Sequence, residues 1–218
     1  MPQLKSWPEE KRSHNTTSKT MKNSEKSGFT EHFIRANGLC ENDFEEWLLC
    51  SGMLFNSPDS WWGIQGKRKK LHEGLDLGFY RNQKKEIIGF NDSTKIPTPY
   101  DGVIVGIFND FLGKSIFVKH EISSADAGTL FTIFGHVNPE KEIYPGMRLE
   151  EGEIIASVAN AGTSRMSPHL HISIGWAKKE ITDEFLDWKV ISSSETLKLI
   201  DPLEIIGRYS LVSTSTLI

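Results

Sequence analysis

From about residue 66 onward, the chain is a series of short apolar segments rich in Val, Ile and Phe, separated by Gly, Pro, Asp and Asn. The segments with the length and composition of β-strands read "GVIVGIF", "KSIFVKH", "TLFTIFGHV", "EIIASVA" and "HLHISIGW". Turn-forming sequences such as "PYDG", "FLGK", "YPGM" and "EEGE" lie between them. Short strands at this spacing favour an antiparallel sandwich or barrel over alternating βα units. The sequence therefore predicts a mainly β fold, of the β-rich α+β class.

Composition divides the 218 residues into four parts. Residues 1–28 are polar and rich in Lys, Ser, Asn and Thr, which predicts a disordered arm. Residues 29–65 are predicted to form a short helical appendage. Residues 66–205 hold the predicted β-domain, and residues 206–218 form a C-terminal tail. A chain of this length suits one domain with appendages.

Two short helices are expected in the appendage. Thr30 can cap the first helix and Gly38 can end it. The second is expected within "ENDFEEWLLCSGM", with Asn42 as its cap and Gly52 as its stop. Phe44, Trp47 and Leu48 would form its apolar stripe. The two helices are predicted to pack on the β-domain.

Charge, cysteine usage and the N-terminus limit the possible partners and location. The net charge of −4 gives no electrostatic reason to expect a nucleic acid or an anionic membrane as partner. Cys40 and Cys50 lie in one apolar segment without a CxxC pattern, and they read as small buried hydrophobes. The first residues lack the apolar run of ~7–15 residues that a signal peptide needs. No run approaches the ~20 residues of a membrane helix. The residues alone therefore predict a soluble, cytoplasmic monomer.

The stretch "SPHLHISI" carries two histidines, His169 and His171, in an apolar strand-like run. Residues i and i+2 of a strand share a face, so both imidazoles are expected to point the same way, with Leu170 pointing into the opposite layer. Burying two such rings without partners would cost a few kcal/mol. The pair therefore indicates either a metal site or two satisfied structural residues.

Two further segments carry candidate site residues. In "LHEGLDLG", His72 and Asp76 are four residues apart, and the glycines favour a turn leading into a strand over a helix. A histidine and a carboxylate close together can supply zinc with one nitrogen and one oxygen ligand, although a solvated loop pair would look the same. His136 ends the strand-like segment "TLFTIFGHV", and His120 is similarly placed in "IFVKHE". Either of these two could be structural.

One zinc ion per chain would organise these residues. A catalytic zinc takes three protein ligands and keeps its fourth position for water. His72, Asp76 and one histidine of the late pair would complete that set. The other histidine of the pair and His136 would then be free to act on the water and the substrate.

Three motifs in order, "HEGLD", "FGH" and "PHLH", resemble those of the lysostaphin/LytM-type zinc endopeptidases. Their pattern is HxxxD, a histidine after a Tyr/Phe-x pair, and HxH. The intervening segments "IPTPYDGVIVGI" and "YPGMRLEEGEIIASVANAGTS" are also similar to those of the family. The resemblance covers residues 66–175. It departs from the family in a longer link between Asp76 and Pro97 (residues 79–96) and in Ser167, where the family usually has Gly before Pro.

The resemblance implies both a site and an activity. It implies that the zinc ligands are His72, Asp76 and His171, and that His136 and His169 are the catalytic histidines. The implied fold is an open antiparallel β-sheet with a groove, of the duplicated hybrid motif type. The implied substrates are peptide bonds in peptidoglycan stems or cross-bridges, which places the protein in the periplasm or cell envelope and conflicts with the cytoplasmic expectation above.

Two other function classes fit parts of the sequence. Some relatives with this fold have lost zinc ligands and regulate other wall enzymes, but all five polar positions are present here. A biotinyl or lipoyl carrier domain shares the turn-and-strand character of "YPGMRLEEGEIIASV". Such a carrier needs a modified lysine in a context such as "MKM" or "DKA", which the chain lacks, and it leaves the histidines unexplained.

Overall fold

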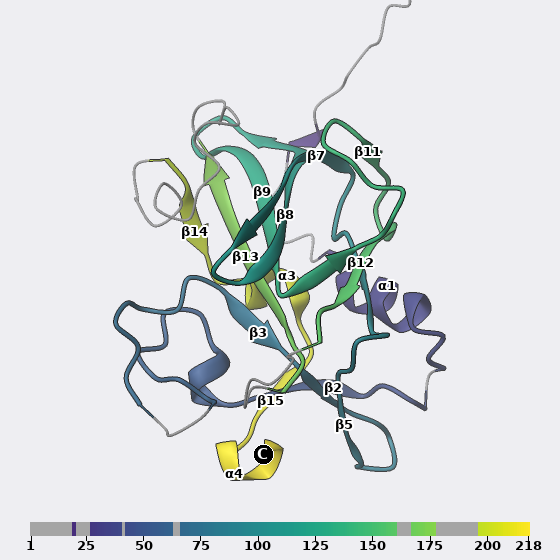
Figure 1. Ribbon diagram of the computed structural model, residues 1–218, viewed down its shortest axis with the longest axis vertical. Coiled ribbons are helices and arrows are strands. Elements are labelled where there is room, and N and C mark those ends of the chain that lie inside the picture. The colour runs from purple at the N-terminus through teal and green to yellow at the C-terminus, as the bar shows by residue number, and fades with distance from the viewer. Residues whose placement is uncertain (1–18, 21–26, 41, 63–65, 161–166, 178–195) are drawn as a thin grey trace, which may run out of the picture.

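A long, twisted antiparallel sheet forms the centre of the protein (Figure 1). The computed structural model describes residues 19–20, 27–40, 42–62, 66–160, 167–177 and 196–218. Within them, the sheet runs in the order β11 (Arg148–Leu149), β7 (Gly102–Asp110), β8 (Gly113–Ser124), β9 (Gly128–Gly135), β13 (Leu170–Ala177) and β14 (Lys198–Ile200). β3 (Leu75–Leu77) pairs with β13, and β1 (Lys19–Thr20) pairs in parallel with β8. The mainly β class predicted from the sequence is confirmed.

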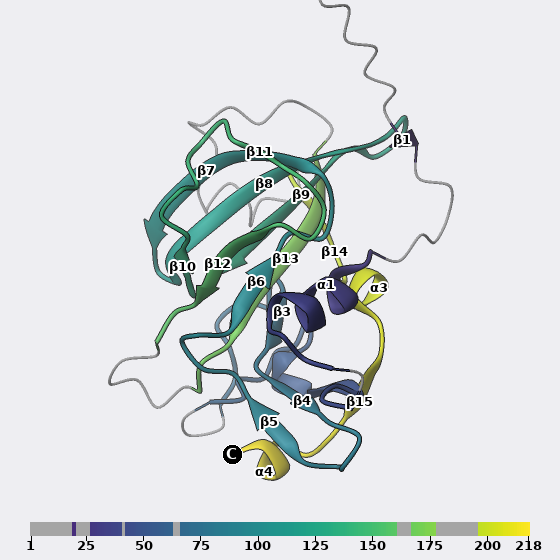
Figure 2. The same cartoon turned by 90° about the vertical axis from the view of Figure 1, so that its right-hand side faces the viewer.

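Two smaller sheets complete the fold. β10 (Val137–Pro139), β12 (Ile154–Val158) and β6 (Lys95–Pro97) form an antiparallel sheet that lies against the central one (Figure 2). The other sheet has the order β15 (Tyr209–Leu211), β2 (Glu46–Leu49), β4 (Phe79–Arg81) and β5 (Ile87–Gly89). It joins the N-terminal segment, the long link after Asp76 and the C-terminal tail. Three parts of the chain that the sequence keeps far apart therefore share one small sheet.

The prediction of a second helix in the N-terminal appendage is wrong. Residues Glu46–Leu49 form strand β2, which pairs antiparallel with β4 and parallel with β15. Trp47, Leu48 and Leu49 are all fully buried, so both faces of the strand are covered. A continuous apolar run of this kind fits a buried strand as well as a helix. The segment is a strand because it pairs with β4 and β15, which are distant in the sequence.

Short helical segments surround the sheets. α1 (Phe29–Ala36) follows Gly28 rather than being capped by Thr30, whose hydroxyl donates instead to the Ile206 carbonyl at 2.9 Å. A 3-10 turn, η1 (Ser51–Met53), follows β2, and α3 (Leu203–Ile206) and α4 (Thr214–Leu217) lie near the C-terminus. Among the described residues, no helix has both the length and the apolar character needed to cross a membrane.

The two faces of the central sheet carry different clusters of apolar side chains. One face packs into the main core through alternate residues such as Ile116, Leu130 and Ile172. The opposite face carries a smaller cluster that includes Phe117 and Ile133. Because strand residues alternate between faces, His169, His171 and Ser173 accompany the second set. We call these the inner and the outer face; the candidate site lies on the outer face.

Candidate metal centre

Strand register brings the candidate residues together. Asp76 on β3 is opposite His171 on β13, and His171 is in turn opposite Gly135, the last residue of β9. Leu75 and Leu77 enter the main core, so Asp76 between them points to the outer face. His72 lies just before β3, and His136 just after β9. The structure therefore gathers His72, Asp76 and His171 at one place on the outer face.

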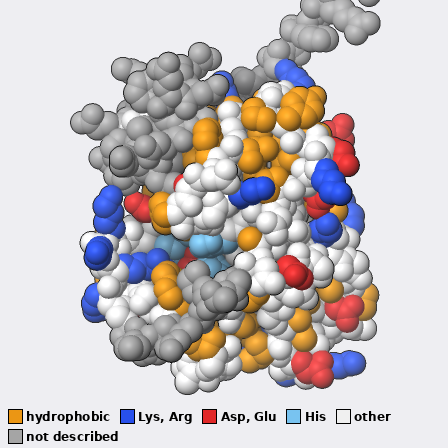
Figure 3. All heavy atoms as spheres, viewed as in Figure 1, with side chains coloured by type: hydrophobic (Ala, Val, Ile, Leu, Met, Phe, Trp, Pro, Cys, Tyr) orange, Lys and Arg blue, Asp and Glu red, His pale blue; other side chains and the backbone are white. Residues whose placement is uncertain are grey.

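The three side chains form a tight, buried cluster. His72 Nε2 lies 3.1 Å from Asp76 Oδ1 and 3.2 Å from His171 Nδ1, and His171 Nδ1 lies 2.9 Å from Asp76 Oδ1. One possible ligand atom from each residue lies within 4.8 Å of the others. All three residues are at least 95% buried. Figure 3 shows histidine side chains in a recess of the surface.

The outer partners of the two imidazoles direct their other nitrogens inward. His72 Nδ1 lies 2.9 Å from the Leu54 carbonyl, which can only accept, so Nδ1 carries the proton and Nε2 of the neutral ring is bare. His171 Nε2 contacts Ser173 Oγ at 3.0 Å, which leaves Nδ1 for the cluster. Such outer contacts are how proteins orient metal-binding histidines. Two ring nitrogens and a carboxylate oxygen that face one another require a cation or a proton between them.

Charge and burial act together on the cluster. Burial, the largest influence, would raise the pKa of Asp76, but the adjacent imidazoles of His72 and His171 outweigh it and hold the pKa well below its usual range. Asp76 is therefore ionised at neutral pH. Burial lowers the pKa of His171, against the opposing effect of Asp76. A neutral imidazole and an ionised carboxylate are the protonation states that a divalent metal binds.

Close packing around Gly74 keeps the cluster compact. A Cβ at this position would lie 2.5 Å from the Ile172 carbonyl oxygen and 2.8 Å from His171 Nε2. Glycine thus lets the turn between His72 and Asp76 pass directly against β13. This gives a structural reason for the glycine in "HEGLD".

His169 and His136 lie beside the cluster and face each other. Their ring centroids are 4.6 Å apart. His169 Nδ1 lies 2.9 Å from the Ser167 carbonyl, so Nε2 of the neutral ring is bare; it lies 4.0 Å from Asp76 Oδ1. His136 adopts a left-handed conformation (φ 58°), and its backbone bonds Leu112 and Ala159. This conformation is uncommon for a non-glycine residue, although histidine is enriched in it and Asn56, Lys85 and Arg208 also adopt it.

His120 is not part of the cluster. It lies on the inner face, where Nδ1 donates to the Asp101 carbonyl at 3.2 Å and Nε2 accepts from Thr132 Oγ1 at 2.8 Å. Burial lowers its pKa to about 4. Both nitrogens are satisfied by the protein, so His120 is a structural residue.

The sequence did not indicate the residues that surround the cluster. Trp61 and Arg68 both contact Asp76, and Ser173 contacts His171. The only available signal was the tryptophan pair in "DSWWGIQGKR", and nothing in that stretch connects it to Asp76.

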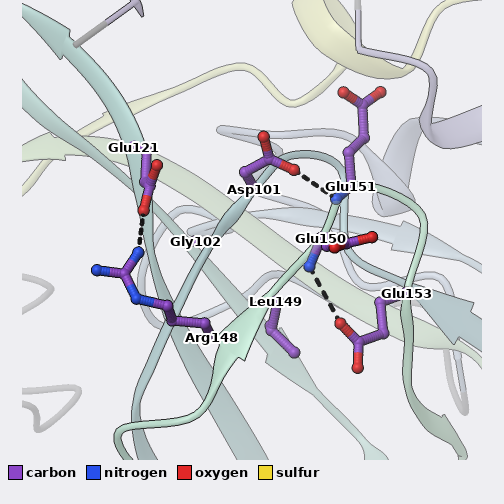
Figure 4. Close-up of a pocket in the computed structure, with 8 residues that line it drawn as sticks. All are labelled: Asp101, Gly102, Glu121, Arg148, Leu149, Glu150, Glu151 and Glu153. Carbon is purple, nitrogen blue, oxygen red and sulfur yellow. Dashed lines mark hydrogen bonds and ion pairs between the residues drawn. The ribbon is translucent and has the colours of Figure 1, made fainter. Parts of the chain in front are cut away.

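A separate hollow lies where β7, β8 and β11 meet the turn after β11 (Figure 4). Its volume is about 770 Å³, and its lining is rich in acidic residues. Several of these bond within the pocket: Arg148 pairs with Glu121, Asp101 accepts from the Glu151 N–H, and Glu153 accepts from the Glu150 N–H. None of the histidines discussed above lines it, so it is separate from the candidate centre.

The donor set fits zinc. Two imidazole nitrogens and one carboxylate oxygen are ligands that zinc takes in catalytic sites, where a fourth position stays open. The sheet and the cluster together define a β-rich protein with a His–Asp–His group that could hold a metal ion. Residues 72–183, just over half of the chain, match the model of peptidase family M23. The chain belongs to this family.

Solved structures similar to the chain include several M23 proteins. The catalytic domain of lysostaphin from Staphylococcus simulans is 19% identical, with a TM-score of 0.43, over 66% of this chain and 85% of that one. A mutant catalytic domain of the prophage-encoded M23 protein EnpA from Enterococcus faecalis is 23% identical (TM-score 0.33; 55% and 82% covered). A zinc-containing peptidase from Vibrio cholerae is 17% identical (TM-score 0.38; 65% and 41% covered). No curated protein matches the chain.

Proposed function

We propose that the protein is a zinc-dependent endopeptidase that hydrolyses peptide bonds in peptidoglycan stem peptides or cross-bridges. The observation that carries the proposal is the cluster of His72, Asp76 and His171, with its possible ligand atoms within 4.8 Å of one another. Membership of peptidase family M23 supports the peptidase activity. The catalytic domain of lysostaphin, an antimicrobial peptidase, and a zinc-containing peptidase are among the similar structures.

His72, Asp76 and His171 would hold one zinc ion per chain. Zinc in such a site supplies a Lewis acid and lowers the pKa of bound water toward ~7. Asp76 is the single charged ligand of the proposed set, so the site keeps a net charge of +1 and the metal stays strongly electrophilic. Arg68 Nη2, 3.3 Å from Asp76 Oδ2, adds positive charge on the outer side of the carboxylate.

His169 and His136 would move the protons. His169 presents a bare Nε2 toward the centre, which is the state that a general base needs. Burial, helped by the nearby imidazoles of His169 and His171, lowers the pKa of His136 to about 4, so the His136 ring is neutral at pH 7. One ring would take a proton from the attacking water, and the other would stabilise the developing oxyanion or protonate the leaving amine.

The test is a digestion of purified peptidoglycan by the zinc-loaded protein. New amino termini and product masses would report the bond that is cut. A chelator should stop the release of amines, and added zinc should restore it. Binding of peptidoglycan without cleavage by the zinc-loaded protein would overturn the proposal in favour of a non-catalytic regulator.

A peptidoglycan substrate also implies a place of action. We propose that the protein works in the periplasm or cell envelope, where its substrate is located. Fractionation of the native host with an antibody to the protein tests this. Detection only in the cytoplasm would contradict it and would point to a cytoplasmic peptide or a recycled wall fragment as the substrate.

A further inference from the structure

The two oxygens of the Asp76 carboxylate have different surroundings. Oδ1 faces His72 and His171 at 3.1 and 2.9 Å. Oδ2 faces away from them and accepts hydrogen bonds from Trp61 Nε1 at 2.7 Å and from Arg68 Nη2 at 3.3 Å. A carboxylate whose second oxygen is held in this way can give a metal one oxygen only.

Trp61 is placed to act on two residues of the centre at once. Its side chain is almost fully buried, and its indole N–H is used on Asp76. The same ring meets the His169 ring edge to face, with centroids 5.1 Å apart and an interplanar angle of 82°. Moving this indole would therefore disturb the proposed ligand and the proposed catalytic histidine together.

Arg68 is itself held firmly. Nη2 also donates to the Gly52 carbonyl at 3.1 Å, and Nε donates to the Asp59 carbonyl at 3.0 Å. The guanidinium lies over the ring of Trp62, 4.4 Å from its centroid. These contacts fix the orientation of the planar fork of the Arg68 guanidinium. A flexible lysine could not reproduce this arrangement.

These residues lie before the part of the chain that defines the family. The family match begins at residue 72, whereas Trp61 and Arg68 lie in the segment after β2. Gly52 permits the close approach of η1 to this segment, because a Cβ there would lie 2.7 Å from the Trp61 backbone nitrogen. The segment is therefore packed against the centre through backbone as well as side chains.

We propose that Trp61 and Arg68 are positioning residues of the metal centre. They hold Asp76 Oδ2, so that Oδ1 alone is directed at the metal, and Trp61 also orients the His169 ring. The N-terminal segment thus completes the centre by supplying its outer contacts. This inference rests on the proposed zinc site, but it does not depend on which bond is cut.

The test compares zinc affinity, by chelator competition, in the full chain and three variants. Trp61→Phe keeps a buried aromatic ring and loses only the indole N–H, and outer-contact losses of this kind typically weaken metal binding by about 10–100-fold. Arg68→Lys keeps the charge and loses the fork, so we expect a smaller loss in the same direction. Trp47→Phe is the matched control, since Trp47 Nε1 makes a similar buried bond to Thr30 Oγ1 (3.0 Å) outside the cluster. It should bind zinc like the wild type.

The visible absorption spectrum of the cobalt-substituted protein gives a readout that a loss of stability would not move. Trp61→Phe should change the band positions, and Trp47→Phe should leave them unchanged. Wild-type affinity and spectrum in Trp61→Phe would overturn the proposal, as would an equal loss of affinity in Trp47→Phe. If Trp61→Phe does not fold, wild-type affinity in Arg68→Lys would overturn it instead. A wild-type protein that binds no zinc would refute the proposed function itself, which is a different outcome.

Discussion

The central sheet buries histidines on both faces, but the two faces use them differently. On the inner face, His120 donates to one oxygen and accepts from another, so the protein satisfies both ring nitrogens. On the outer face, His72 and His171 each use one nitrogen on the protein and direct the other at Asp76. The inner histidine has only neutral protein groups as partners, whereas the two outer histidines share one oxygen of an ionisable carboxylate, as metal ligands would.

Burial therefore does not by itself identify a site in this fold. Burial lowers the pKa of both His120 and His171. The difference lies in the polar atoms that each ring faces. His120 faces a carbonyl and a hydroxyl group, whereas His171 faces the Asp76 carboxylate and the His72 imidazole. We therefore expect substitution of the inner-face histidine to change mainly stability. Substitution of the outer-face histidines should change mainly metal binding and turnover.

The largest effect is expected for His171→Ala. Loss of a ligand removes the metal, and the several kcal/mol of transition-state stabilisation that a metal supplies corresponds to a fall in turnover on the order of 10⁴-fold. Elemental analysis should find the zinc lost. His120→Gln is the control on the inner face and should retain zinc. Equal zinc loss in both variants would contradict the assignment of metal binding to the outer face alone.

The next largest effect is expected for His169→Ala, which separates the proposed catalyst just before β13 from the proposed ligand His171 on β13. His169 Nε2 is not part of the three-residue cluster, so most of the zinc should remain. Turnover should fall by roughly 10²-fold or more, as for the loss of a general acid or base. Zinc content and peptidoglycan digestion of the same sample measure both quantities. Full turnover would refute the role assigned to His169.

The next prediction concerns His120 on the inner face, which should make the stability of the protein depend on pH in the acidic range. The folded-state pKa of His120, about 4, lies below the value of about 6.5 expected in the unfolded chain. Between these values the unfolded state binds more protons, so stability falls as the pH drops from 6.5 to 4, by about 3 kcal/mol from this residue. Urea denaturation of metal-free protein across this range should show a shallower decline in His120→Gln. The same decline in both would contradict the assignment.

The smallest effect is expected for Gly74→Ala, which tests how tightly the outer face is packed. The added methyl group would press on β13 and on the His171 ring, so we expect a loss of about 1–3 kcal/mol in stability together with weaker zinc binding. Gly89→Ala on β5 is the control, since a Cβ there makes ordinary contacts of 3.5 Å. Denaturation and chelator competition measure the two effects. A Gly74→Ala protein with unchanged zinc affinity would show that the cluster tolerates looser packing.

The sequence predicted the features that depend on local periodicity. Strand alternation predicts His169 and His171 on one face and Leu170 in the core, and the structure has Leu170 in the core at the start of β13 with both histidines beside Asp76. It failed where pairing partners come from distant parts of the chain. The apolar run in β2 was predicted to be helical because its partners, β4 and β15, lie far away in sequence. For the same reason, the sequence did not predict the contacts of Trp61 and Arg68 with Asp76, which form only in the folded chain.

X-ray absorption at the zinc edge of the zinc-loaded wild-type protein tests the central claim most directly. We predict one zinc per chain with two imidazoles and only nitrogen and oxygen ligands, at about 2.0–2.2 Å. The described cysteines, Cys40 and Cys50, are free, so sulfur ligands at about 2.3 Å would place the metal elsewhere. A sulfur ligand, or a protein that retains no zinc, would contradict the assignment of the outer-face cluster as the metal centre.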